Sequence, residues 1–210
     1  MHMSANSFSP QSEVPHARAA TTGIVSGTRV ATTVGWRAVE DVKPGEKVLT
    51  FDGGLQEVIR VERRRLWPSA KGCPRDVWPL TVPVGALGNH SEMQLLPDQP
   101  VMLESDAAED IFGDPFTLMA AQALEGLRGI ARAIPETQIS VVTLYFATEQ
   151  LVFANIGALF LCPQDVSARN DAPDPESMVY SMLPLDRAAS LTRIIAREES
   201  QAAQAASAEV

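Results

Sequence analysis

Short runs in which apolar and polar residues alternate follow one another between residues 22 and 163, separated by turn-forming residues. Alternation with a period of two is typical of strands that bury one face. The runs are residues 28–32, 46–51, 55–66, 93–103, 139–146 and 151–161. Asp52, Gly53 and Gly54 follow the second run, and a glycine there accepts the positive φ of a tight hairpin turn. The pattern predicts a β-rich domain over residues 22–163.

Two segments have helical features instead. Residues 120–126 combine good helix formers with a final glycine, which predicts a short helix. Further along, apolar residues recur at helical spacing and predict an amphipathic helix over residues 184–200. They include Leu185, Leu191, Ile194 and Ile195. The apolar face of this helix can dock on the chain's own domain or bind a protein partner, and the sequence leaves both open.

The remaining segments are rich in polar and small residues. Residues 1–21 are interpreted as a flexible leader, residues 164–183 as a linker and residues 201–210 as a disordered tail. The leader lacks the apolar stretch of a secretory signal peptide, so the cytoplasm is the default compartment, with export by another route left open. The most apolar late run, residues 151–162, is shorter than the roughly 20 residues that span a bilayer. No membrane span is expected.

Composition supports a packed core and argues against one class of partner. Apolar residues make up 45% of the 210 residues, which is enough for a hydrophobic core. Asp and Glu number 26 against 17 Lys and Arg, giving a formal charge of -9. Because an acidic protein repels the phosphate backbone of nucleic acids, no nucleic-acid partner is expected.

Few residues are available to bind a metal or to form a disulfide framework. The two cysteines, Cys73 and Cys162, form no CxxC pair, and the chain has 3 histidines. An acidic stretch lacks the residue order of a calcium-binding loop and is interpreted as a solvated loop. It contains Glu104, Asp106, Glu109 and Asp110. We expect neither a metal nor a cofactor.

Four blocks of sequence, taken in order, carry a resemblance to a known family. They are Gly27-Thr28; Val39-Glu40 with Pro44-Gly45-Glu46 and Val48-Leu49-Thr50; residues 95–103 (LLPDQPVML); and Leu144-Tyr145-Phe146 with residues 149–155 (EQLVFAN). They resemble the Hint (hedgehog/intein) domain, the self-processing fold, and within it the short bacterial Hint-domain proteins. The resemblance covers residues 22–163. It implies an all-β, Hint-like horseshoe of bent antiparallel strands with pseudo-twofold subdomains, one short helix and a C-terminal amphipathic helix.

The resemblance also implies a chemistry. An active Hint domain rearranges the peptide bond before its first residue. A Cys or Ser side chain attacks the carbonyl and converts the amide into a thioester or ester. A His in the third block acts as a general acid and protonates the departing amide nitrogen. Another nucleophile then takes the acyl group.

This chain departs from the family at each position that carries the chemistry. Gly23 occupies the place of the nucleophile and has no side chain. In the third block Leu96 replaces a Ser or Thr, and Gln99 replaces the His; an amide cannot cycle a proton near neutral pH. In the fourth block Glu149 replaces a second His. These joint losses predict a Hint-like domain without autoprocessing activity that acts as a binding or scaffold module.

Two other readings stay open. Thr22 and Ser26 carry hydroxyls near Gly23 and are candidate nucleophiles for an N–O acyl shift that cleaves the chain just before one of them, with His90 as a relocated acid. The chain could instead be an unrelated β-rich interaction domain. If it binds a protein, the loop from Trp67 to Trp78 is a second candidate surface beside the helix at residues 184–200.

Overall fold

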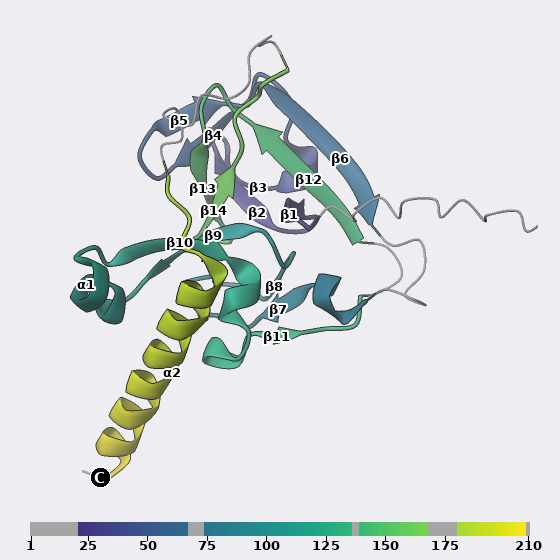
Figure 1. The fold of residues 1–210 in the computed structure, drawn as a ribbon. Helices are drawn as coiled ribbons and strands as arrows, with labels where there is room; N and C mark the ends of the chain where they lie inside the picture. The colour runs from purple at the N-terminus through teal and green to yellow at the C-terminus, as the bar shows by residue number, and fades with distance from the viewer. Residues whose placement is uncertain (1–20, 67–73, 136–138, 168–179, 209–210) are drawn as a thin grey trace, which may run out of the picture.

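The computed structural model describes residues 21–66, 74–135, 139–167 and 180–208, which form two β-sheets and a long C-terminal helix (Figure 1). One sheet has six strands in the order β11-β7-β8-β1-β12-β6. They are β1 (Ile24–Val25), β6 (Arg60–Leu66), β7 (Leu80–Val82), β8 (Met93–Leu95), β11 (Ala131–Arg132) and β12 (Ile139–Tyr145). β6 and β12 are the longest and lie side by side over seven residue pairs.

The other sheet has the order β10-β9-β14-β13-β2-β4-β5, with β3 paired to β2. Its strands are β2 (Arg29–Thr32), β3 (Gly35–Ala38), β4 (Lys47–Thr50), β5 (Gly54–Glu57), β9 (Pro100–Glu104), β10 (Phe116–Ala120), β13 (Gln150–Ala154) and β14 (Ala158–Cys162). Every pairing between these strands in the described part of the chain is antiparallel. The expectation of an all-β fold with one short helix and a C-terminal helix is confirmed.

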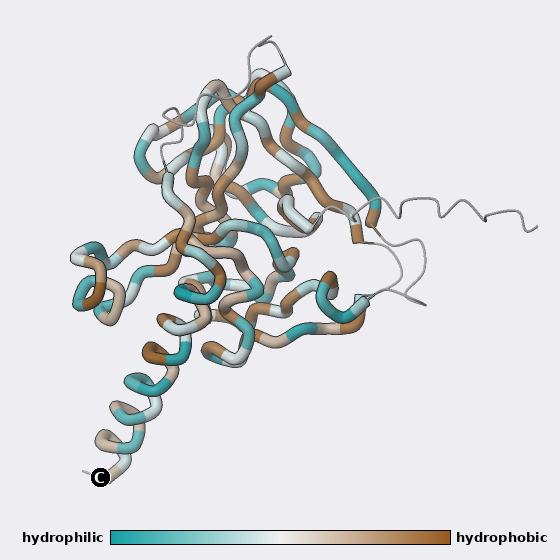
Figure 2. The backbone as a smooth tube through the Cα atoms, in the orientation of Figure 1, coloured by the Kyte–Doolittle hydropathy of each residue, from teal (hydrophilic) through white to brown (hydrophobic). Residues whose placement is uncertain are grey.

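One hydrophobic core joins the two sheets. Leu144 of β12 and Phe160 of β14 are fully buried in it, and so is Leu95 of β8. In β4 the burial alternates, so that Val48 faces the core and Leu49 does not, as the period of two requires. Figure 2 shows hydrophobic segments gathered where the strands cross. Burying each such side chain contributes about 1.5–3 kcal/mol, which makes this core the main stabilising feature.

The predicted run at residues 55–66 is split between the two sheets. The hairpin at Gly53 forms as expected, and β5 pairs with β4. At Val58 and Ile59 the chain changes partners, because the N–H of Val58 donates to the carbonyl of Glu46 and the N–H of Ile59 donates to the carbonyl of Tyr145. The rest of the run is β6 in the other sheet. Alternation persists across such a crossing, so the pattern alone does not reveal it.

Two further runs, each predicted as one strand, form two strands in the structure. Residues 151–161 form a hairpin of β13 and β14 whose turn holds Asn155 and Ile156 at φ of 44° and 83°. Asn155 and Gly157 are turn-forming residues, but a β-branched residue with positive φ is rare, so a turn centred on Ile156 was not predicted. Residues 93–103 divide into β8 and β9, and the turn between them is closed by the N–H of Gln99, which donates to the carbonyl of Leu96. This turn places Gln99 at the site described below.

The predicted helix at residues 120–126 is wrong. That segment contains the end of β10 and a single 3-10 turn, Ala121–Leu124. The short α-helix is α1 (Asp106–Phe112), which replaces the acidic loop expected there. The Ser105 side chain accepts a hydrogen bond from the N–H of Ala108, and Gly113 ends the helix at a φ of 76°. A serine at the N-cap and a glycine after the last turn are typical of helix ends, and these two residues could have predicted α1 from the sequence.

The C-terminal helix α2 (Leu185–Ala208) continues beyond its predicted end. The interpretation of residues 201–210 as a disordered tail is wrong for residues 201–208, which are helical. Ala and Gln are good helix formers, and no Gly or Pro interrupts the segment. Residues 209–210 lie outside the described residues, as do residues 1–20, Trp67 and residues 168–179 of the predicted linker.

The first turns of α2 pack on the chain's own domain. Leu191 and Ile195 are 1% and 3% exposed in the core, and Arg128 binds Glu199 at 2.6 Å. Leu191 and Ile195 are therefore unavailable to a protein partner, contrary to one expectation, because the helix buries its apolar stripe intramolecularly. Leu185 and Ile194 remain exposed, and a partner there stays a prediction. The helix then projects away from the sheets (Figure 1). None of the helices in the described part of the chain is long and apolar enough to cross a membrane.

Candidate functional site

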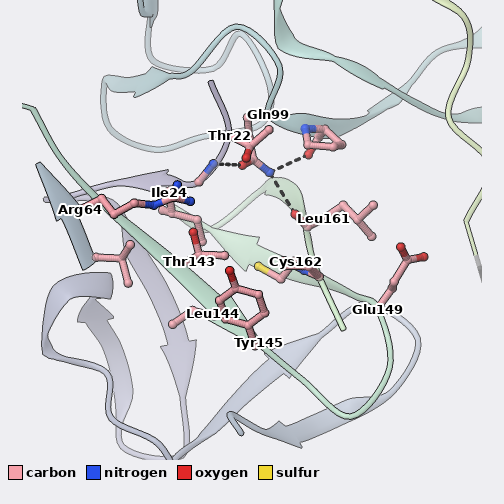
Figure 3. Close-up of a pocket in the computed structure, with 14 residues that line it drawn as sticks. Thr22, Ile24, Arg64, Gln99, Thr143, Leu144, Tyr145, Glu149, Leu161 and Cys162 are labelled. Carbon is pink, nitrogen blue, oxygen red and sulfur yellow. Dashed lines mark hydrogen bonds between the residues drawn. The ribbon is translucent and has the colours of Figure 1, made fainter. Parts of the chain in front are cut away.

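Three of the positions where the family chemistry would reside line one pocket of about 260 Å³. Gly23 precedes β1, Gln99 precedes β9 and Glu149 precedes β13, so three chain segments far apart in sequence converge. β12 and β14 supply much of the walls, including Leu144 and Leu161 (Figure 3). The register of the six-stranded sheet positions the pocket, because Ile24 pairs with Val142 of β12.

Gly23 is held in a conformation that disfavours a side chain. Its φ is +120°, a region that L-residues rarely adopt. A Cβ built on Gly23 would lie 2.4 Å from Cγ1 of Val141 and 3.2 Å from Oγ1 of Thr143. A cysteine at the position that resembles the family's nucleophile would therefore require backbone strain and a shift of Val141.

Gln99 is fixed by hydrogen bonds at both ends of its side-chain amide. Its Oε1 accepts the N–H of Gly23 at 2.8 Å. Its Nε2 donates to the carbonyls of Pro100 and Leu161, each at 3.0 Å. Figure 3 shows the amide between these partners. The side chain is 2% exposed, so Gln99 ties together three segments of the fold and has no proton to deliver to the Gly23 nitrogen.

Glu149 contributes an unpaired carboxylate oxygen. Among the described residues, its Oε2 is the single buried side-chain nitrogen or oxygen atom with no hydrogen-bond partner. Native structures pair nearly all such atoms. The carboxylate of Glu149 also interacts electrostatically with the hydroxyl of Tyr180. Burial and then its hydrogen bond to Asp52 raise the pKa of the Tyr180 hydroxyl most, and the charge of Glu149 adds to them.

Cys162, at the end of β14, also lines the pocket, a role that the sequence did not indicate. It is 2% exposed, and burial raises the pKa of its thiol to about 12. The thiol is therefore neutral at physiological pH, whereas the thiolate is the nucleophile. Only the pairing of β14 with β13 and β9 brings Cys162 to this site.

One charged side chain of β6, Arg64, lines the same pocket, and it belongs to a group of paired charges on and beside that strand. Arg64 lines the pocket and lies 3.1 Å from Glu62. The guanidinium of Arg60 stacks 3.4 Å from the centroid of the Tyr145 ring and lies 3.3 Å from Asp165. The hydroxyl of Tyr145 donates to Glu62, which lowers the pKa of that carboxyl. Arg64 and Glu149 lie at opposite ends of the residues drawn in Figure 3.

Leu96 is the one family-equivalent position that does not line this pocket. It is fully buried in a small separate cluster with Val25, Leu66, Ile139 and Val141. A leucine there fills space between β1 and β12. No polar side chain from this position reaches the Gly23 peptide bond.

The two candidate nucleophiles and the candidate acid proposed from the sequence do not lie together. Thr22 is exposed at the lip of the pocket. Ser26 lines a different pocket, beside Glu40 and Arg63. His90 is exposed in the loop after β7, where its N–H donates to the carbonyl of Asn155, and it does not line the site.

The chain just before Thr22 is anchored. The hydroxyl of Thr21 donates to Oδ2 of Asp98, and the N–H of Asp98 donates to the carbonyl of Thr21 at 2.9 Å. Nε2 of Gln122 donates to the other oxygen of Asp98 at 2.7 Å. Asp98 thus anchors Thr21, the first described residue, beside the domain. In the described part of the chain no three His, Cys, Asp or Glu side chains gather as metal ligands would.

Comparisons with known proteins agree with the blocks in the sequence. The chain matches the family model of the Hint domain over residues 22–159. No curated protein matches it.

Among solved structures it is similar to a bacterial intein-like domain from Clostridium thermocellum, at 16% identity and a TM-score of 0.47, over 66% of this chain and 97% of that one. It is similar to the AceL NrdHF class 3 split intein, a GSH-linked splice-inactive variant, at 12% identity and a TM-score of 0.44, over 68% and 98% of the two chains. It is also similar to the gp41-1 intein, at 13% identity and a TM-score of 0.41, over 68% and 98%. The family match covers well over half of the chain and rules out the reading as an unrelated β-rich domain; the protein belongs to the Hint domain family.

Proposed function

We propose that this Hint domain does not process itself and that the pocket at its former processing site binds a ligand. The observation that carries the proposal is the conformation of Gly23. A nucleophile at that position would need a side chain, and a Cβ there would lie 2.4 Å from Val141. The residue is accommodated as a glycine by the surrounding fold, so loss of the nucleophile is built into the packing around β12.

The hydrogen bonds of Gln99 support the same conclusion. In the family chemistry the amide nitrogen of the first residue must receive a proton as the bond breaks. Here the N–H of Gly23 donates to Gln99, which is an acceptor at that atom. This hydrogen bond holds the intact amide in place, and Gln99 offers no acidic proton to the Gly23 nitrogen.

Among the described residues, neither of the remaining hydroxyls near Gly23 is hydrogen-bonded to a base. Thr22 and Ser26 are hydroxyls, which need a neighbouring base to attack a carbonyl, and His90 does not line the pocket. Cys162 lines it, but burial raises its pKa and keeps the thiol protonated. Cleavage before Thr22 or Ser26 is the alternative function, and the following experiment decides between the two.

The test is a fusion of a reporter domain ahead of residue 1, followed on denaturing gels with and without dithiothreitol or hydroxylamine. We expect the reporter to stay attached under all conditions, and the Thr22→Ala and Ser26→Ala variants to behave identically. Release of the reporter that disappears in one of these variants would overturn the proposal. It would also identify that hydroxyl as the nucleophile.

A further inference from the structure

β6 is an edge strand of the six-stranded sheet. It stands last in the order β11-β7-β8-β1-β12-β6, and its seven residues pair with β12 along one side (Figure 1). In the described part of the chain no strand pairs with its other side. An edge strand presents unpaired backbone donors and acceptors, onto which another extended chain can add as a further strand.

The register shows which backbone groups of β6 face outward. In an antiparallel sheet the N–H and C=O of one residue point to the same side, and the side alternates along the strand. The N–H of Ser26, directly after β1, donates to the carbonyl of Ser140, so the backbone of Ser140 faces β1. The next residue, Val141, therefore faces β6 and bonds with its partner Arg64. The residues of β6 that alternate with Arg64 face away from β12, and they are Val61, Arg63 and Arg65. None of their backbone groups has a hydrogen-bond partner among the described residues.

Arg63 and Arg65 make one face of this edge positive. Side chains two positions apart on a strand lie on the same face, and both arginines are exposed and line a pocket of about 450 Å³ with Ser140. The guanidinium of Arg63 donates to the carbonyls of Glu40 and Val42, which are neutral acceptors and leave its charge in place. Arg65 forms no ion pair in the part of the chain that the structure describes. The carboxylate of Glu40 lines the same pocket and offsets one of the two charges at most.

The charge of the edge selects its occupant. If two copies of β6 paired with each other, their arginines would lie together, and like charges on paired strands are destabilising. An added strand with acidic side chains opposite Arg63 and Arg65 would instead bring opposite charges together, with Cβ atoms about 4.5–5.5 Å apart. A nucleic acid could contact the arginines but would leave the backbone groups of the edge unpaired, and the net charge of -9 repels it. An acidic extended peptide meets both requirements.

We propose that β6 binds an extended acidic segment of a partner protein, which adds to the sheet as an antiparallel strand. Two acidic residues, two positions apart, lie opposite Arg63 and Arg65. At about 3.3 Å per residue, a segment of about seven residues matches the length of β6. The surface goes beyond the proposed function, because neither Arg63 nor Arg65 lines the pocket at Gly23.

The test is a fluorescence-anisotropy titration of the full chain into a labelled, end-capped peptide of sequence TVEVEVT. In the antiparallel register the two Glu residues supply the N–H groups that donate to β6. A second peptide, methylated at those two amide nitrogens, keeps the charges and loses the donors. We expect saturable binding of the first peptide, and binding of the methylated peptide that is weaker by about tenfold or more because two hydrogen bonds are lost.

Two protein variants test the charge. Arg65→Glu should lower the affinity by about fivefold or more, since an attraction between opposite residues becomes a repulsion. Arg187→Glu is the matched control, because it makes the same change of charge at an exposed position of α2 and should bind as the parent does. Circular dichroism verifies that both variants are folded. In the parent, hydrogen exchange followed by NMR should show that the peptide protects the N–H groups of Arg63 and Arg65.

Four results would overturn the inference. They are no saturable binding of the first peptide, equal binding of the methylated peptide, an affinity unchanged in Arg65→Glu, and exchange at Arg63 and Arg65 that the peptide does not slow. Equal binding of the methylated peptide would mean that the arginines attract acids without strand pairing. A chain that cleaves itself contradicts the proposed function and leaves this inference untouched.

Discussion

The N–H of Gly23 donates a hydrogen bond of 2.8 Å to Oε1 of Gln99, which stands 76 positions later in the chain. The sequence blocks align both residues with positions at which the Hint family is expected to carry its chemistry, and here the two residues bond directly to each other.

The first prediction concerns the space at Gly23. Gly23→Ala should destabilise the fold by about 2–4 kcal/mol, from backbone strain at positive φ and from overlap with Val141. Gly27→Ala is the matched control, because Gly27 also has a positive φ, of +91°, but nothing lies within 4 Å of its Cβ. Urea unfolding should show the larger loss for Gly23. Equal losses would mean that the contact with Val141 does not restrict this position.

The second prediction concerns the donors of Gln99. Gln99→Glu keeps the shape but places acceptors against the carbonyls of Pro100 and Leu161. We expect a loss of about 2–4 kcal/mol, since these buried groups become unpaired. Gln94→Glu in β8, a half-buried position, should change the free energy of unfolding by no more than about 0.5 kcal/mol. A Gln99→Glu variant as stable as the parent would show that the three segments do not depend on this amide.

The third prediction uses the buried thiol. Burial raises the pKa of Cys162 to about 12, whereas an exposed thiol titrates near about 8.5. The folded state therefore holds this proton more tightly, so the stabilising contribution is present below about pH 8.5 and is lost as the pH rises toward the folded pKa. Over that range the group lowers the free energy of unfolding by up to about 1.4 kcal/mol per pH unit.

The measurement is urea unfolding at several pH values above 8.5 in a Cys73→Ser background, with and without Cys162→Ala. The variant without Cys162 should show a shallower loss of stability with pH. Indistinguishable slopes would contradict the burial of this thiol. Rapid labelling of Cys162 by a thiol reagent without denaturant would contradict it independently.

The fourth prediction separates the two sides of α2. Leu191→Ala should cost about 2–5 kcal/mol, because the side chain is buried in the core. Ile194→Ala, at an exposed position on the same helix, should cost less than about 1 kcal/mol. Thermal or urea unfolding measures both. Similar small effects would mean that the helix is not docked on its own domain.

The sequence indicated the site better than it indicated the elements that build it. The blocks around Gly23, Gln99 and Glu149 predicted their family positions, and the structure places all three on one pocket. Leu96 belongs to the same block as Gln99, yet it turns into a separate cluster. Short turns reverse the direction of side chains, so neighbours in a motif need not share a cavity.

Long-range pairing explains most of what the sequence could not give. Cys162 reaches the pocket only through the partners of β14, and Arg64 only because β6 pairs with β12. Neither pairing has a local signature. The misplaced short helix is different, since Ser105 and Gly113 cap α1 and a capping argument would have located it.

The most direct test of the central claim is the intact mass of the purified, untagged full-length protein, measured before and after prolonged incubation with a thiol or with hydroxylamine. An unchanged mass under both conditions is the predicted result, because Gly23 supplies no nucleophile and Gln99 no acid. A shorter chain beginning at Thr22 or Ser26 would contradict the account and show that a hydroxyl has taken over the cleavage.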